Sequence, residues 1–287
     1  VERDPDEPGA HAAGGAEFRV EDTRAYGGYV LHIGRVTRRE LRVGDVVMLD
    51  LDAKRRESIA ANHTATHLLN LALREALGPG VDQRGSAVQS DKLRFDFAFN
   101  QPVPPEHLAK AEAHVRALIE RDLPVHAQVV PLDMARGIKG LRAVFGEAYP
   151  DPVRVVSIGR TVDEMLRESD EAKAMATSVE FCGGTHLART GAAGAFALAS
   201  EEGVAKGIRR ITALTGVPAM AAVAAGEAVE ARVKAAGNLS ESDLAKEAKE
   251  IQQQLESLTI PLPHKHRLKG MLEALVERVK AAAKQAS

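Results

Sequence analysis

The sequence contains a single cysteine and no tryptophan, and aromatic residues make up only 3% of its 287 positions. One cysteine cannot form a disulfide within the chain, so nothing indicates a secreted, disulfide-stabilised fold, and a reducing compartment is expected. No apolar run approaches the roughly 18–20 residues of a membrane span, which predicts a protein with no membrane contact. With 45% hydrophobic and 27% charged residues, the composition is that of a soluble globular protein with an aliphatic core.

The chain also lacks a strong excess of either charge. Its formal net charge of -2 at pH 7 gives no general attraction to nucleic acids, although a local basic stripe is sufficient for binding them. The first residues lack the basic and then apolar pattern of a signal peptide. The chain starts at Val1 rather than at methionine. We therefore expect a cytoplasmic location and a start that is not the native N-terminus, which leaves a mitochondrial or plastid location open.

Two pairs of potential metal ligands share the same spacing. Cys182 is followed four residues later by His186, and His63 is followed four residues later by His67. Residues 58–77 read as a helix, in which a four-residue spacing places both imidazoles on one face. The second pair flanks two glycines, which favour a tight turn. Thiolate and imidazole are the ligands that zinc prefers, and four of them complete a tetrahedral shell, so the two pairs together predict one zinc site.

Each pair by itself has a simpler interpretation. Two histidines at helical spacing often arise by chance, and a free cysteine between loop residues is commonly a small buried apolar side chain. A zinc protease is excluded, because its motif needs a glutamate where this sequence has Thr64. The zinc prediction therefore depends on the two pairs lying together in the fold.

Longer stretches around these pairs carry a family resemblance. They are residues 62–69, 83–86, 93–97, 149–156, 181–186 and 206–211. These stretches resemble the editing domain of alanyl-tRNA synthetase, over a match that runs from about Phe18 to Gly216. Free-standing alanyl-tRNA editing proteins resemble the same domain, so a fragment of a synthetase and a complete editing protein are both open.

The resemblance implies an activity, a cofactor and a partner. The activity is zinc-dependent hydrolysis of the ester that joins serine or glycine to the 3′ end of tRNA(Ala), with correctly charged alanine spared. Such a second site is needed because a pocket for alanine excludes glycine poorly, and one added hydroxyl changes binding by only about 1–3 kcal/mol. No segment resembles an ATP-binding aminoacylation domain, so charging of tRNA is not expected.

The resemblance also suggests roles for residues other than the four zinc ligands. Gln83, which can donate and accept hydrogen bonds, and Thr64, between the two histidines, are the candidate catalytic helpers. Lys206, Arg209 and Arg210 are the candidate tRNA contacts, although a run of charges is more often a solvated surface. Zinc could polarise a carbonyl, activate a water or only position the substrate. Four protein ligands are typical of a structural zinc, so a non-enzymatic RNA-binding module is the alternative function.

The order of short strands and helices, without a regular βαβ repeat, predicts an α+β fold. We expect a partial β-barrel with a flexible N-terminal loop at 1–57, and a zinc-binding editing domain of the threonyl- and alanyl-tRNA synthetase type, a mixed sheet with helices, at 58–216. The barrel is expected to be incomplete, because the family's upstream glycine-rich element is missing. The expected strands are 18–20, 29–33, 46–51, 93–99, 125–130 and 153–158, and the expected helices are 58–77, 104–121 and 162–167.

Residues 217–287 form a third expected region. Apolar residues recur there at alternating steps of four and three, which predicts amphipathic helices. The first series is Leu244, Ala248, Ile251, Leu255 and Leu258, and the second is Leu268, Leu272, Leu275, Val279 and Ala282. Pro261 and Pro263 separate the two series, so we expect an antiparallel, coiled-coil-like helical hairpin. Its stripes could also mediate self-association, and the outer face of the last helix is basic.

Overall fold

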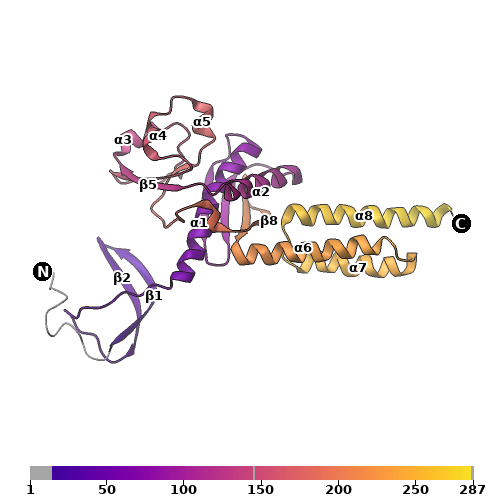
Figure 1. Ribbon diagram of the computed structural model, residues 1–287, viewed down its shortest axis with the longest axis horizontal. Helices are drawn as coiled ribbons and strands as arrows, with labels where there is room; N and C mark the ends of the chain where they lie inside the picture. The colour runs from indigo at the N-terminus through magenta and orange to yellow at the C-terminus, as the bar shows by residue number, and fades with distance from the viewer. Residues whose placement is uncertain (1–14, 145, 286–287) are drawn as a thin grey trace. The chain divides into compact units, whose positions relative to one another are not determined.

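The computed structural model describes residues 15–144 and 146–285, except for the side chains of Glu241, Val279 and residues 282–285. The chain divides into two compact units, Val1–Asp52 and Ala53–Ser287. Antiparallel sheets and helices occur together, which confirms the predicted α+β class (Figure 1). Most of the predicted N-terminal loop lies outside the described residues, and so do the side chains of the last two residues of the second predicted apolar series.

The described residues of the first unit include a β-hairpin. It consists of β1 (Glu17–Tyr26) and β2 (Tyr29–Arg38), which pair in antiparallel fashion. Gly27 and Gly28, both with positive φ, form the two-residue turn that glycine favours. The prediction of a third strand at 46–51 is wrong, because these residues are irregular and exposed. A β-rich sequence needs a neighbouring strand to complete its backbone hydrogen bonds, and within the described residues this segment pairs with none.

The second unit begins with the helix that carries the histidine pair, α1 (Ala53–Leu77). It starts five residues before the predicted position and ends where expected, at Gly78, whose φ of 99° suits a glycine. Leu68, Leu69 and Leu73 are fully buried and form its inner face. His67 is itself only 3% exposed and so belongs to the interior.

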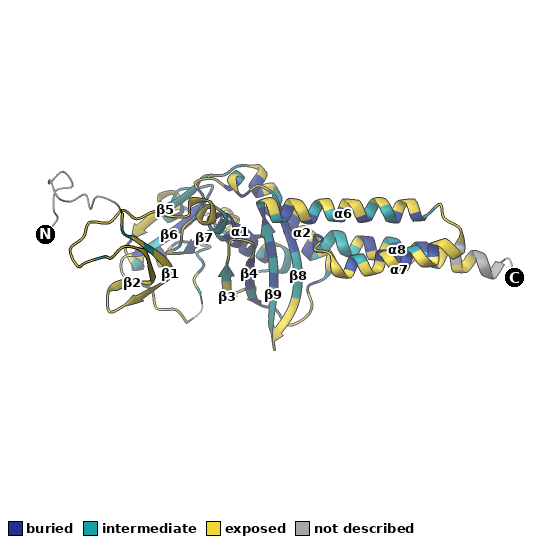
Figure 2. Ribbon diagram, turned by 90° about the horizontal axis from the view of Figure 1, so that it is seen from below, coloured by how far each residue is buried: buried dark blue, intermediate teal, exposed yellow. Residues whose placement is uncertain are grey.

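Helix α1 packs on a sheet together with α2. The sheet has the order β3-β4-β9-β8 and every neighbouring pair is antiparallel. Its elements are β3 (Gln83–Val88), β4 (Leu93–Ala98), α2 (Pro105–Glu120), β8 (Phe196–Ala205) and β9 (Ile208–Thr215). A strand was predicted at 93–99, and β4 alternates in burial: Leu93, Phe95 and Phe97 are fully buried under the helices, and the residues between them are half-buried (Figure 2).

A smaller sheet of order β5-β6-β7 provides the second ligand pair. Its strands are β5 (Val125–Val130), β6 (Val153–Ile158) and β7 (Val179–Phe181), with the short helices α3 (Leu132–Arg136), α4 (Val162–Arg167) and α5 (Glu171–Met175) and the 3-10 turn η1 (Thr190–Ala193). The predictions of β5, β6 and α4 are confirmed to the residue. Helices α3 to α5 and this sheet share an apolar cluster of their own.

The C-terminal region forms a helical bundle rather than a simple hairpin. Helices α7 (Glu241–Ser257) and α8 (Leu262–Gln285) are the predicted pair, and α6 (Gly216–Ala236) packs against both. The sequence analysis did not identify α6 as a separate helix, because the side chains on its buried face are mostly small. They are Ala219, Ala222, Gly226, Val229, Val233 and Ala236. No described helix, α6 included, has the length and apolarity to cross a membrane. The apolar stripes pack within the chain, and self-association through 217–287 stays a prediction.

Candidate metal centre

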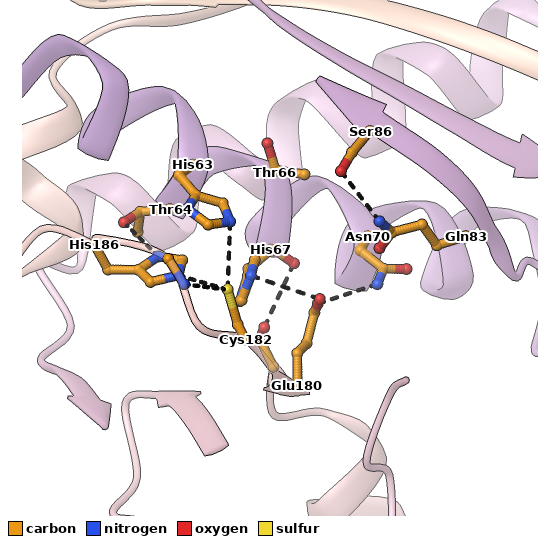
Figure 3. Close-up of polar contacts among 12 residues, drawn as sticks. His63, Thr64, Thr66, His67, Asn70, Gln83, Ser86, Glu180, Cys182 and His186 are labelled. Carbon is orange, nitrogen blue, oxygen red and sulfur yellow. Dashed lines mark hydrogen bonds and ion pairs between the residues drawn. The ribbon is translucent and has the colours of Figure 1, made fainter. Parts of the chain in front are cut away.

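The two predicted ligand pairs meet in the second unit. His63 and His67 come from α1, while Cys182 and His186 come from the irregular segment that follows β7 (Figure 3). Their ligand atoms all lie within 4.8 Å of one another. Residues more than a hundred positions apart in sequence therefore converge on one point, as the paired spacings predicted.

The loop between Cys182 and His186 is held close to α1. A side chain at Gly184 would bring its Cβ within 2.2 Å of the His63 ring, so only glycine fits there. The Arg154 guanidinium donates hydrogen bonds to the carbonyls of Cys182, at 2.7 Å, and Gly184, at 2.9 Å. The glycine was predicted for its conformational freedom, and the structure adds a second reason, which is close approach.

Two distances within the group match those of a tetrahedral zinc shell. Cys182 Sγ lies 3.4 Å from His63 Nε2 and 3.3 Å from His186 Nε2. Bonds of about 2.0–2.3 Å to a common tetrahedral centre separate neighbouring ligand atoms by about 3.3–3.7 Å. These contacts therefore have the spacing that zinc requires.

The outer hydrogen bonds of the histidines orient their rings. The other ring nitrogen, Nδ1, of His63 lies 3.3 Å from the Thr185 carbonyl, and that of His186 lies 3.2 Å from the Thr64 hydroxyl. Each contact leaves Nε2 free to face Cys182. Such outer contacts are typical of histidines that bind metals.

His67 provides an independent test of the fit. Its Nε2 lies 3.7 Å from Glu180 Oε2, while its Nδ1 is buried without a hydrogen-bond partner among the described residues. An unpartnered buried nitrogen costs free energy, and a metal bound at Nδ1 would satisfy it. The donor set and this atom together fit zinc.

The environment keeps the imidazoles in the form that binds metal. Burial lowers the pKa of His63 and His67, and it lowers the pKa of His186 to about 3, with the charge of His63 as a second cause. All three rings are therefore neutral at pH 7. Burial raises the pKa of the Cys182 thiol, so the thiol is protonated and metal binding must displace its proton.

Glu180 and Asn70 support the centre, and the sequence analysis missed both. Glu180 is buried, and burial raises its pKa to about 7 despite the charge of Arg142. Asn70 donates a hydrogen bond of 3.1 Å to its carboxylate. Both lie at short intervals from the candidate ligands: Glu180, on β7, precedes Cys182 by two residues, and Asn70 follows His67 by three on α1. Those spacings are the signals that could have identified them.

A cavity of about 640 Å³ lies against the centre. His63, His67 and Cys182 form part of its wall, and His186 is not among the described lining residues. Gln83 also lines it, and its amide donates to the Ser86 hydroxyl at 3.2 Å. The first predicted catalytic helper therefore shares a cavity with the predicted metal ligands.

The second predicted helper, Thr64, lies behind the ligands. Its hydroxyl is fully buried, contacts His186 and accepts a hydrogen bond of 3.1 Å from the Leu187 amide. Thr64 is not among the described residues that line the cavity. Its place in the fold favours orienting a ligand over contacting a substrate.

The three predicted tRNA contacts lie on the β8–β9 hairpin. Arg209 pairs with Glu201 at 2.5 Å, and Arg210 makes two contacts of 2.7 Å with Asp96. Lys206 is exposed at the turn between the strands. The carboxylates already neutralise both arginines, so the prediction of a phosphate contact now rests mainly on Lys206.

Comparisons with known proteins agree with the motifs. Residues 153–212 match the family described as "Threonyl and Alanyl tRNA synthetase second additional domain". The mitochondrial alanine–tRNA ligase of Saccharomyces cerevisiae is 43% identical over 92% of this chain and 27% of its own length. The cytoplasmic alanine–tRNA ligase of Dictyostelium discoideum is 45% identical over 85% of this chain and 26% of its own length. The alanine–tRNA ligase of Candida albicans is 45% identical over 93% of this chain and 28% of its own length.

The chain thus spans just over a quarter of the length of these relatives. The matched family segment contains Cys182 and His186 but not the histidine pair of α1. The resemblance that the motifs predicted is confirmed over most of the chain. Similar proteins are named for the cytoplasm and for mitochondria, so both locations stay open.

Proposed function

We propose that this chain, which corresponds in sequence to a segment of the alanine–tRNA ligases, is an aminoacyl-tRNA deacylase that removes serine or glycine from the 3′ end of tRNA(Ala). The observation that carries the proposal is the position of the zinc-compatible ligands on the wall of a cavity that also contains Gln83. The tRNA-related family match and the alanine–tRNA ligase relatives support the class of substrate.

Zinc held by His63, His67, Cys182 and His186 would supply a positive charge beside the reacting group of the substrate. Four protein ligands usually describe a structural metal. Here, however, three of the four line the cavity, so the centre lies at its surface rather than behind it. This position supports a direct effect on the bound aminoacyl group.

Gln83 would bind the aminoacyl group from another part of the cavity wall. Its amide presents both donors and an acceptor, which suit a carbonyl, an amino group or the hydroxyl of serine. A site that hydrogen-bonds a hydroxyl discriminates strongly against the analogue that lacks it. This contact would separate serine from alanine, whereas glycine must be distinguished by its smaller volume.

The test is release of labelled amino acid from tRNA(Ala) charged with serine, glycine or alanine. The zinc-loaded protein should hydrolyse the first two much faster than the third. Cys182→Ala should lose both zinc and activity, and Gln83→Ala should keep zinc but lose activity by about 10²–10³-fold if its amide stabilises the transition state. His63→Asn removes one of the four proposed ligands. Its matched control is His107→Asn, which replaces a histidine on α2 outside the cavity.

A non-enzymatic RNA-binding module with a structural zinc is the alternative function, and the complete set of four protein ligands favours it. In that case the zinc-loaded protein would bind tRNA and leave seryl- and glycyl-tRNA intact. Equal hydrolysis of alanyl-tRNA would also contradict the editing proposal.

A further inference from the structure

The cavity contains a second group of polar side chains beyond the metal ligands. Arg142 lines the cavity and is only 7% exposed, and none of its three guanidinium nitrogens has a hydrogen-bond partner among the described residues. Arg74 also lines the cavity, is half-buried, and has an unpartnered Nε. A buried guanidinium without acceptors is costly, so this cluster is incomplete by itself.

Helix α1 fixes the position of the cluster relative to the metal ligands. His63, His67, Asn70 and Arg74 follow one another at steps of four, three and four, and all line the cavity. They therefore form one stripe along the helix, and a rise of 1.5 Å per residue separates His67 from Arg74 by about 10 Å.

Arg142 reaches the same region from the small sheet. Its amide donates to the Val179 carbonyl at 2.9 Å, and its backbone forms a bridge with Glu180. The charge of Arg74 lowers the pKa of Arg142, although burial is the larger cause and the value stays at about 10. The two guanidinium groups are thus both charged and close enough to repel each other.

Carboxylates of the chain do not pair with these two arginines. No ion pair joins Arg142 or Arg74 to a carboxylate within the described contacts, although Asp82 and Glu180 also line the cavity. Among the described lining residues, four arginines face three carboxylates, and a zinc centre would add positive charge. An oxyanion between the guanidinium groups would supply the missing acceptors and offset their repulsion.

We propose that Arg142 and Arg74 bind the phosphate of the terminal nucleotide of the charged tRNA. This inference rests on the proposed function and names the part of the substrate that this end of the cavity recognises. With the phosphate at the arginines and the aminoacyl ester at the metal ligands, one nucleotide lies along the α1 stripe. The volume of about 640 Å³ is within the range of sites for ligands of this size.

The experiment compares two small probes that differ only in the phosphate. One is adenosine, and the other is the methyl ester of adenosine 5′-monophosphate, which carries one negative charge as an internucleotide phosphate does. Their dissociation constants are measured by calorimetry on the zinc-loaded chain. The phosphorylated probe should bind about 10–100-fold more tightly, as expected for charge-assisted hydrogen bonds.

Arg142→Met should reduce this preference to less than about threefold, and Arg74→Met should reduce it partly, because Arg74 is less buried. Arg136→Met removes an exposed arginine of α3 outside the cavity and should leave the preference unchanged. Circular dichroism and zinc content show whether Arg142→Met folds. If it does not, the proposal is tested with Arg74→Met alone. With seryl-tRNA as substrate, either cavity variant should raise KM more than it lowers kcat, since the contact is remote from the ester.

Equal binding of the two probes to the wild-type chain would overturn the proposal. So would a phosphate preference that survives in both cavity variants, or inorganic phosphate alone binding as tightly as the nucleotide probe. The two proposals can fail separately. A preserved phosphate preference without deacylation would contradict only the proposed function, whereas deacylation without a phosphate preference would contradict only this subsite.

Discussion

Replacing Thr64 with valine separates the two roles that its hydroxyl could have at the metal centre. The change keeps the size of the side chain nearly constant and removes only the hydroxyl. In the structure this hydroxyl contacts His186 Nδ1 at 3.2 Å and accepts a hydrogen bond from the Leu187 amide at 3.1 Å. Both contacts are lost in the variant, and of the two partner residues Leu187 is buried and His186 is half-buried.

Two separate costs are expected. The Leu187 amide loses its acceptor, which should lower the free energy of unfolding by about 1–3 kcal/mol even without metal. Loss of the outer contact to His186 should weaken zinc binding by about 10–100-fold. Because zinc stabilises the folded state in proportion to the logarithm of its affinity, the zinc-loaded variant should lose a further 1.4–2.7 kcal/mol or so.

The assay is urea unfolding with zinc and with a chelator, together with zinc affinity from chelator competition. Thr66→Val is the matched control, since Thr66 is also buried on α1 but donates its hydrogen bond to the Asn62 carbonyl within the helix. It should keep the zinc affinity. An unchanged affinity in Thr64→Val would refute the orienting role. Deacylation that stays low at full zinc occupancy would instead show that the hydroxyl acts on the substrate.

Three further outcomes are expected. Lys206→Ala should weaken tRNA binding and reduce the slope of log affinity against log salt concentration by about one, without changing stability. Arg209→Ala should instead lower the free energy of unfolding by about 1–3 kcal/mol, because it leaves Glu201 unpaired. Filter binding at several salt concentrations measures the first effect, and urea unfolding measures the second. Hydrogen bonding from Lys234 is the largest cause that lowers the pKa of Glu230 from 4.5 to about 2. Its stabilising contribution is therefore complete above pH 4.5 and is lost as the pH falls toward 2, so Glu230→Gln should flatten the fall of the urea midpoint between pH 5 and 2. Ile251→Ala, at a fully buried position of the helical bundle, should lower the free energy of unfolding by about 2–5 kcal/mol and leave zinc content unchanged.

Local patterns were sufficient for much of the secondary structure. Strands β5 and β6 and helix α4 have the predicted bounds, because their periodicity and flanking residues act over a few positions. The strand expected at 46–51 failed for the opposite reason. Its residues favour extended structure, but a strand also needs a partner, which no local pattern provides.

The site shows the same division between local and distant information. Chemistry and spacing identified His63, His67, Cys182 and His186, since few residue types bind zinc and the two pairs repeat one interval. Sequence alone could not tell that Thr64 points to a ligand while Gln83 faces the cavity. Thr64 lies on α1 and Gln83 on β3, so that difference depends on how these two elements pack against distant segments of the chain.

The sequence by itself thus determined the candidate donor set and the helix that presents half of it, because both depend on residue identity and on intervals of a few positions. Only the tertiary structure decided which charges are already neutralised and which are not. Arg209 and Arg210 looked equivalent to any other exposed cation, yet Glu201 and Asp96 pair with them across strands. Arg142 carried no motif, yet folding buries its guanidinium without an acceptor. Burial and pairing arise from contacts between segments far apart in the chain, and those contacts exist only once the fold has formed.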